Sequence, residues 1–213
     1  PASPVFQSRI RENCRKLIAM GVNGIYLDQI GQLAPMPCFD AAHGHPLGGG
    51  AWWTECYRAM LEPILEDAEG KAFLATENAS EPYLGAITSL LMWTEITGDD
   101  FPGLTQVYSN YAYYFGALSF PEDDLVGFAA TQKRCVLWGY QPGWMVWLYG
   151  QTPDKLTPEH QAKIDYLNRV IEWRRELRPY LADGELMRDV TVTSPNPPLR
   201  IKWFRMQGAE HDE

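Results

Sequence analysis

The stretch GVNGIYLDQIG, residues 21–31, decides how the rest of the sequence is interpreted. In this stretch Asp28 follows directly on the apolar run Ile25, Tyr26 and Leu27. A carboxylate next to a buried run costs free energy unless it is paired or used in chemistry, so its position needs a reason. A short apolar run bounded by glycines predicts a buried strand, which we expect at 24–29. Asp28 would then lie at the carboxyl end of that strand.

Strands and helices alternate along the sequence around this first strand. Helical spacing of apolar residues predicts a preceding helix, capped by Ser8 and ended by Gly21. Further strands are expected at 72–77, 90–93, 104–109 and 143–149. Further helices are expected near 53–70, 80–91, 110–118, 121–139 and 157–180. Alternation of this kind predicts a parallel sheet in an α/β fold.

Two architectures carry such a sheet, and the sequence favours one of them. No glycine-rich phosphate loop follows any expected strand, which disfavours a nucleotide-binding doubly wound sheet. We therefore expect a (β/α)8 TIM barrel, which needs eight units and roughly 250 residues. Residues 1–183 would supply its C-terminal portion, about the last five βα units. After Gly184 two antiparallel strands, 185–193 and 199–204, are expected, so 184–213 would begin a β-sandwich domain.

Composition restricts the class of partner. The 213 residues have a formal net charge of −9 and a pI near 4.9. An acidic chain offers no basic surface for nucleic acid or anionic membranes, and no apolar run approaches the roughly 20 residues that span a bilayer. The chain does not open with Met, so we expect a longer parent that completes the barrel. The location of that parent is left open, with secretion or the periplasm as the expectation.

Two acids stand at the ends of neighbouring expected strands. Asp28 ends the first, and Glu77 ends the second; by the two-residue period of a strand, Tyr26 shares a face with Asp28. In a TIM barrel, the chemistry gathers at this end of the strands. Two facing carboxyl groups are the arrangement that cleaves glycosidic bonds. The structural alternative is that Asp28 caps a turn and Glu77 pairs with a lysine or arginine.

The same motifs resemble a known group of enzymes. The stretch 21–31 resembles the fourth-strand motif of retaining glycoside hydrolases of the α-galactosidase and endo-α-N-acetylgalactosaminidase superfamily, and of their uncharacterised glycosidase-like relatives. The segment FLATEN, residues 73–78, is similar to the fifth strand of the second group. This resemblance implies that Asp28 is the nucleophile and Glu77 the acid/base. It extends over most of the chain, through LTQVYSNYAYYFG (104–116) and WRRELRPYLADGEL (173–186).

The resemblance leaves a rival for the acid. The α-galactosidases proper take their acid from the sixth strand, and here Glu95 follows the corresponding segment 90–93. Glu95 is therefore the alternative acid. A retaining pair should lie roughly 5–6 Å apart, whereas roughly 6.5–9.5 Å would imply inversion. Glu77 should also be less solvated than Asp28 and have a raised pKa.

Other side chains are candidates for sugar contacts. Aromatic rings at expected strand ends suit the C–H faces of sugars, and polar groups beside them can bond hydroxyls. The candidates are Tyr26, Gln29, His45, Trp93, Tyr108, Asn110 and Trp144. The loop CFDAAHGHPLGGGAWW, residues 38–53, also holds Cys38, Asp40 and His43. Its spacing matches no recognised ligand pattern, so we expect a substrate-contacting loop, or else a plain solvent loop, and assign no metal and no cofactor.

Three functions follow from these features. The first is a retaining glycoside hydrolase that acts on an oligosaccharide or glycoconjugate. The second is a carbohydrate-binding barrel that has lost turnover. The third is a metal-dependent hydrolase that uses His43 and His45, which would need an ordered ion.

Overall fold

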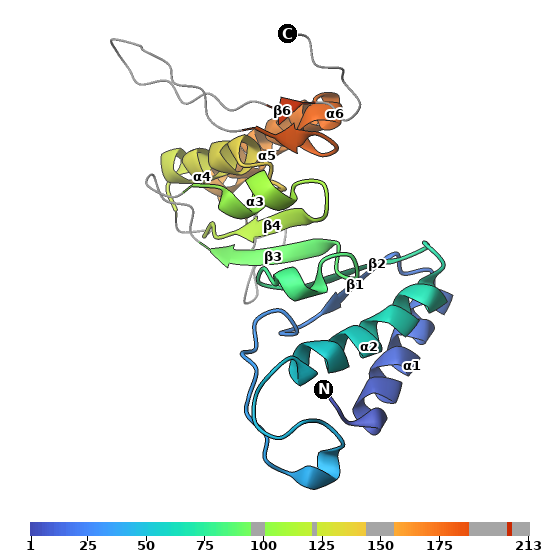
Figure 1. Ribbon diagram of the computed structural model, residues 1–213. Coiled ribbons are helices and arrows are strands. Elements are labelled where there is room, and N and C mark those ends of the chain that lie inside the picture. Colours follow the sequence, from blue (N-terminus) through green and yellow to red (C-terminus); the bar gives the residue numbers. More distant parts are fainter. Residues whose placement is uncertain (95–100, 121–122, 144–155, 188–203, 206–213) are drawn as a thin grey trace. The chain divides into compact units, whose positions relative to one another are not determined.

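The computed structural model describes residues 1–94, 101–120, 123–143, 156–187 and 204–205. The described elements form an α/β fold (Figure 1). The chain divides into two compact units, Pro1–Leu91 and Met92–Glu213, and each is considered by itself. Among the described residues, no helix combines the length and the apolar character needed to cross a bilayer.

The first unit alternates helices and strands. Its elements are α1 (Pro4–Ala19), β1 (Gly24–Leu27), η1 (Ala41–His43), α2 (Trp52–Ala68), β2 (Phe73–Glu77), η2 (Glu81–Tyr83) and the start of β3 (Ser89–Thr94). β1 and β2 pair in parallel, from Gly24 opposite Phe73 to Leu27 opposite Thr76. β2 and β3 are also parallel, with Glu77 opposite Leu91. The carboxyl ends of β1 and β2 therefore meet at one edge of the sheet.

The two faces of this sheet differ in exposure. Leu74 and Thr76 on β2 are fully buried, as are Leu61 and Ile64 of α2, so they belong to one core. On the other face Tyr26 is 42% exposed and Phe73 is 49% exposed. Alternate residues of a strand point to opposite faces, so the open face also carries Glu77.

An ion cluster joins the two helices of the first unit, which lie side by side in Figure 1. Two arginines of α1, Arg11 and Arg15, donate two hydrogen bonds each to the Asp67 carboxylate of α2, at 2.6–2.9 Å. The hydrogen bonds from Arg11 and then Arg15 hold the pKa of Asp67 well below its usual range. The pairing fixes α1 against α2 at the end away from their N-termini.

The second unit is mainly helical in its described part. Its elements are the end of β3, α3 (Gly103–Tyr108), β4 (Tyr113–Ala117), α4 (Leu125–Leu137), α5 (Pro158–Glu176), α6 (Arg178–Leu181), β5 (Glu185–Leu186) and β6 (Phe204–Arg205). The sheet strands follow the order β1-β2-β3-β4. Helix α4 lies against α5, where Phe128 makes an edge contact with the Tyr166 ring. β5 and β6 pair antiparallel.

Much of the expected pattern is confirmed. The α/β class and the parallel pairing of the first three strands agree with the sequence analysis. Asp124 caps α4 and Thr157 caps α5, so the expected helices 121–139 and 157–180 are found with shorter bounds. The closed TIM barrel, its boundary at 183 and the β-sandwich domain stay predictions. The expected strand 143–149 lies mostly outside the described residues.

Three local expectations were wrong. Ser3, not Ser8, caps α1, because Pro4 fits the first helical position and the Ser3 hydroxyl accepts from the Phe6 N–H. The expected helix 80–91 shortens to η2, since Gly85 takes a left-handed conformation with φ +93° that ends it.

The third error exchanged a strand and a helix in 104–118. Residues 103–108 form α3, in which buried Thr105 and half-buried Tyr108 lie three apart while Val107 is 65% exposed. Residues 113–117 form β4, where exposed Tyr113 precedes buried Tyr114. The helical and strand periods are visible only in this burial pattern, because both segments are rich in β-branched or aromatic residues.

Candidate active site

Asp28 and Glu77 occupy adjacent positions at the carboxyl edge of the parallel sheet. Asp28 follows β1 directly, and Glu77 is the last residue of β2. They stand one step beyond the last paired residues, Leu27 and Thr76. Asp28 is exposed and Glu77 is half-buried, so Glu77 is the less solvated of the two.

The two carboxyl groups are coupled. The neighbouring charge that acts on Glu77 is that of Asp28. Burial first, and then the interaction with Asp28, raise the pKa of Glu77 above its ordinary value. The direction agrees with the sequence-based expectation for an acid. The separation of roughly 5–6 Å expected for a retaining pair stays a prediction.

Two neutral side chains complete the polar cluster. Burial first, and then the charges of Glu77 and Asp28, raise the pKa of Tyr26 to about 12. The phenol therefore stays protonated as a donor. Gln32, with its amide nitrogen turned toward Glu77, donates to both carboxylate oxygens at 2.5 and 3.3 Å. The sequence analysis missed Gln32, because an exposed glutamine four residues after Asp28 carries no periodic signal.

A buried hydroxyl fixes the loop that follows Asp28. The Thr76 hydroxyl donates to the Leu27 carbonyl at 2.6 Å and accepts from the Gly31 N–H at 3.3 Å. Thr76 is fully buried. It therefore ties the end of β1 and the start of the next loop to β2, just before Glu77.

Gly31 allows the same loop to lie against the backbone of β2. A Cβ at this position would meet the Glu77 carbonyl oxygen at 2.6 Å and the Asn78 carbonyl oxygen at 3.0 Å. Real Cβ atoms do not come so close to backbone oxygens, so only glycine fits without a shift. This close approach explains the glycine that ends the motif 21–31.

Each acid is followed by a residue in the left-handed conformation. Gln29 has φ 62° and Asn78 has φ 60°, both uncommon for residues other than glycine. Such conformations cost free energy and gather at functional sites. Here they turn the chain sharply away just after each carboxylate.

The remaining sequence-predicted site residues belong to other elements. His45 lies in the loop after β1, stacked on Trp52 with ring centroids 3.9 Å apart. Tyr108 ends α3 and makes an edge contact with Tyr111, and Asn110 is exposed in the turn that follows. Trp93 belongs to β3, and nothing is described of its side chain. Glu95 and Trp144 lie outside the described residues.

Comparison with known proteins gives the family of the chain. Residues 1–120 match the family described as "Domain of unknown function (DUF6259)", and the chain belongs to this family. It is 27% identical over 94% of its length to a Bacteroides thetaiotaomicron protein named "Putative glycoside hydrolase". It is 28% identical over 68% of its length to a Monosiga brevicollis protein named "Putative glycoside hydrolase 22789". The chain spans 30% and 13% of the lengths of these two relatives. No solved structure matches it.

Proposed function

We propose that this chain carries the catalytic pair of a retaining glycoside hydrolase acting on an oligosaccharide or glycoconjugate. The observation that carries the proposal is the coupled pair Asp28 and Glu77, in which Glu77 has the raised pKa that a general acid needs. The names of the two relatives support the same class of reaction. The remaining strands of the barrel would come from the rest of the parent chain.

The first chemical step divides the work between the two acids. The Asp28 carboxylate attacks the anomeric carbon and forms a glycosyl ester, while the bond from that carbon to the leaving oxygen breaks. Glu77 gives its proton to that oxygen. The exposure of Asp28 leaves it accessible to a sugar, and the half-buried setting of Glu77 favours its protonated form.

The second step returns the enzyme to its starting state. Glu77, now a carboxylate, takes a proton from water, and the water oxygen replaces Asp28 on the anomeric carbon. Two substitutions at one carbon retain its configuration. Gln32 can donate to Glu77 while it is ionised, and Tyr26 can donate to the released Asp28 carboxylate.

A glycosidic oxygen bound between the two acids would accept the Glu77 proton, while Asp28 faces the anomeric carbon. This arrangement requires the carboxyl groups to lie roughly 5–6 Å apart, the separation of a retaining pair.

Sugar contacts are proposed for the remaining candidates. Tyr26 and Gln29 flank Asp28 in the chain and are exposed. Trp93, Tyr108, Asn110 and Trp144 are proposed to contact the sugar through ring faces and amide groups. Glu95 stays the alternative acid.

A kinetic experiment on the full-length protein tests the assignment. Aryl glycosides of several sugars are screened, and the configuration of the first product is read by NMR. Asp28→Asn should abolish turnover. Asp165→Asn, at an exposed aspartate on α5, is the matched control and should keep wild-type turnover. Glu77→Ala should lose about 10²–10⁴-fold on poor leaving groups and much less on good ones.

Three results would change the proposal. Wild-type turnover in Asp28→Asn would remove Asp28 as the nucleophile. An inverted product would exclude the retaining mechanism. Sugar binding without turnover of any glycoside would favour the inactive carbohydrate-binding barrel.

A further inference from the structure

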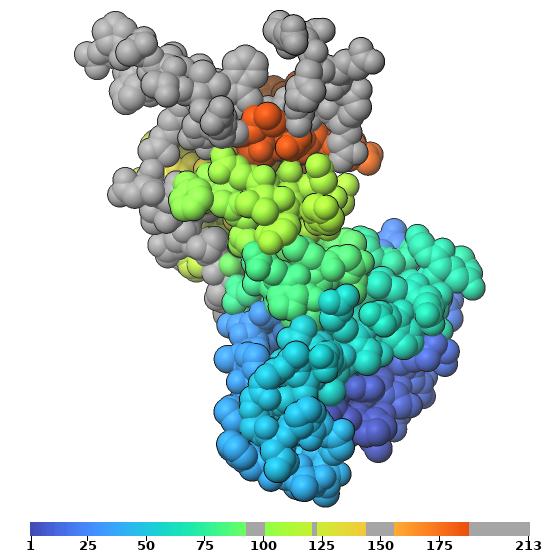
Figure 2. Space-filling view, viewed as in Figure 1, coloured from blue at the N-terminus to red at the C-terminus, as the bar shows by residue number. Residues whose placement is uncertain are grey.

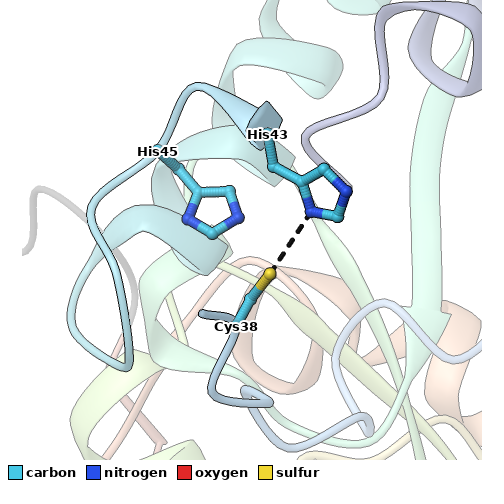
Figure 3. Close-up of side chains that lie close together, drawn as sticks. All are labelled: Cys38, His43 and His45. Atoms are coloured by element: carbon cyan, nitrogen blue, oxygen red, sulfur yellow. Dashed lines mark hydrogen bonds between the residues drawn. The ribbon is translucent and has the colours of Figure 1, made fainter. Parts of the chain in front are cut away.

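A cluster of metal-binding side chains lies in the loop after β1, which the proposed mechanism leaves unused. Cys38, His43 and His45 each offer one ligand atom, and these atoms all lie within 4.8 Å of one another. Figure 3 shows the two imidazole rings and the thiol facing a common space, with Cys38 Sγ 3.3 Å from His43 Nδ1. The segment is at the surface of the first unit, light blue in Figure 2. We propose that these three residues bind a zinc ion.

The distances suit zinc. Zn–S bonds are about 2.3 Å and Zn–N bonds about 2.0–2.1 Å, so tetrahedral ligand atoms lie roughly 3.3–3.6 Å apart. The contact between Cys38 and His43 already falls at this spacing. The His45 ring has only to move inward to complete it. Thiolate and imidazole are also the donors that zinc prefers, and Cys38 would bind after losing its proton to solvent.

Both histidines have the second hydrogen bond that metal-bound imidazoles need. His43 Nε2 lies 3.2 Å from a carboxylate oxygen of Asp40, which leaves Nδ1 for the metal. His45 Nδ1 lies 2.8 Å from the Pro46 carbonyl oxygen, which leaves Nε2. Carboxylates and backbone carbonyls are the usual partners of metal-bound histidines, because they fix the tautomer and the ring orientation.

The loop is held in this shape by contacts outside the cluster. Cys38 and Gly48 exchange two backbone hydrogen bonds at 2.6 and 3.0 Å, which close the loop at its base. Trp52 donates its indole N–H to the Gly48 carbonyl and stacks on the His45 ring with an interplanar angle of 7°. Gly44, with φ 72°, makes the sharp turn between the two histidines. The chain thus holds the three ligands near one another before any ion binds, and only the approach of the His45 ring remains.

The same atoms allow one other chemistry. Cys38, His43 and Asp40 also line up as a thiol, an imidazole and a carboxylate, the order of a nucleophilic cysteine site. Such a site does not need His45, yet His45 converges on the sulfur. The third ligand therefore favours a metal. The ion leaves a fourth position open to water and to the hollow of about 470 Å³ that the three ligands help to line.

Metal binding to the full-length protein tests this proposal. The protein is stripped with a chelator and titrated with Zn²⁺ by calorimetry, then with Co²⁺, whose thiolate charge-transfer and tetrahedral d–d bands report the ligands. Cys38→Ser and His45→Ala should each lose one zinc equivalent and those bands, while Cys56→Ser, a thiol outside the cluster, keeps both. Asp40→Asn should weaken binding about 10- to 100-fold.

Labelling of Cys38 with iodoacetamide separates the two chemistries. Zinc should protect Cys38 from labelling in the wild type but not in His45→Ala. An equal zinc content in the wild type and Cys38→Ser would overturn the proposal. Fast labelling of Cys38 that zinc does not slow would also overturn it, in favour of the thiol and imidazole pair. Neither readout depends on glycosidase activity.

Discussion

Glu77 and Asp28 stand side by side at the ends of two neighbouring parallel strands, and the Asp28 charge helps to raise the pKa of Glu77. The sheet register, which pairs Leu27 with Thr76, makes the two acids neighbours. Burial and a neighbouring negative charge both raise the pKa of a carboxyl group, because each disfavours its charged form. Glu77 has both. The two acids therefore interact electrostatically, in addition to being neighbours at the edge of the sheet.

Removal of the Asp28 charge should lower the pKa of Glu77. In Asp28→Asn the neighbouring charge is gone and only burial still raises that pKa. An NMR titration of labelled Glu77 carboxyl carbons measures the change, and Glu62→Gln, an exposed acid on α2, is the control. An unchanged Glu77 pKa in Asp28→Asn would show that the two groups are not coupled.

The raised pKa of Glu77 also predicts how the stability of the fold depends on pH. A group whose pKa is raised in the folded state stabilises the fold while it is protonated. For Glu77 this contribution is complete below the unfolded pKa of 4.5, and it is lost as pH rises through the folded pKa. At neutral pH the raised pKa of Glu77 therefore costs the wild type stability, and Asp28 is part of its cause. Asp28→Asn should melt at a higher temperature than the wild type at pH 7, and this difference should vanish at pH 3. A lower melting temperature at pH 7 would contradict the prediction.

Gly31→Ala should damage the site through the backbone. The new methyl group would stand 2.6 Å from the Glu77 carbonyl oxygen, so the loop after Asp28 must shift. Overpacking of this kind costs about 1–3 kcal/mol of unfolding free energy, and misplacement by about 1 Å can cost roughly 10²-fold in rate. Denaturant unfolding and kcat/KM measure the two effects. Gly49→Ala, where nothing lies within 4 Å of the added Cβ, should be near wild type in both.

The ion cluster of α1 and α2 should make the first unit sensitive to acid. The pKa of Asp67 is lowered in the folded state. Its contribution to stability is therefore present above the unfolded value of 3.8 and is lost as pH falls toward the folded pKa. Asp67→Asn should lower the melting temperature by about 2–5 °C at pH 7, since the arginines are partly exposed. Glu12→Gln, which breaks only exposed pairs, should change it little. Equal effects of both variants would argue against a special role for Asp67.

The sequence could predict that Asp28 and Glu77 stand at the ends of neighbouring strands, because that signal is local. Asp28 and Glu77 each close a short apolar run, and strand periodicity assigns their faces without tertiary information. The same reasoning failed at 104–118, where the residue types of a strand also fill α3. There tertiary burial of Thr105, and not local preference, decides the helix.

Features that depend on a folded loop could not be predicted. The spacing of Cys38, His43 and His45 is not a known ligand pattern, because their convergence depends on the closure between Cys38 and Gly48. Gln32 reaches Glu77 only because Gly31 lets the loop lie on β2. Such contacts arise from the path of the backbone, which periodicity does not describe.

Thr76 should act as a positioning residue whose hydroxyl, not its size, is required. Thr76→Val keeps the shape but removes the donor to the Leu27 carbonyl and the acceptor for the Gly31 N–H. In a fully buried setting this loss costs about 1–3 kcal/mol and lets the ends of β1 and β2 move relative to each other. We expect kcat/KM to fall tenfold or more in Thr76→Val, with a smaller Glu77 pKa shift because the two acids separate. Thr76→Ser keeps the hydroxyl and should restore the kinetics and the Glu77 pKa while it loses about 1 kcal/mol from the missing methyl group. If Thr76→Ser and Thr76→Val behave alike in both measurements, Thr76 contributes packing only, and the alignment of Asp28 with Glu77 has another cause.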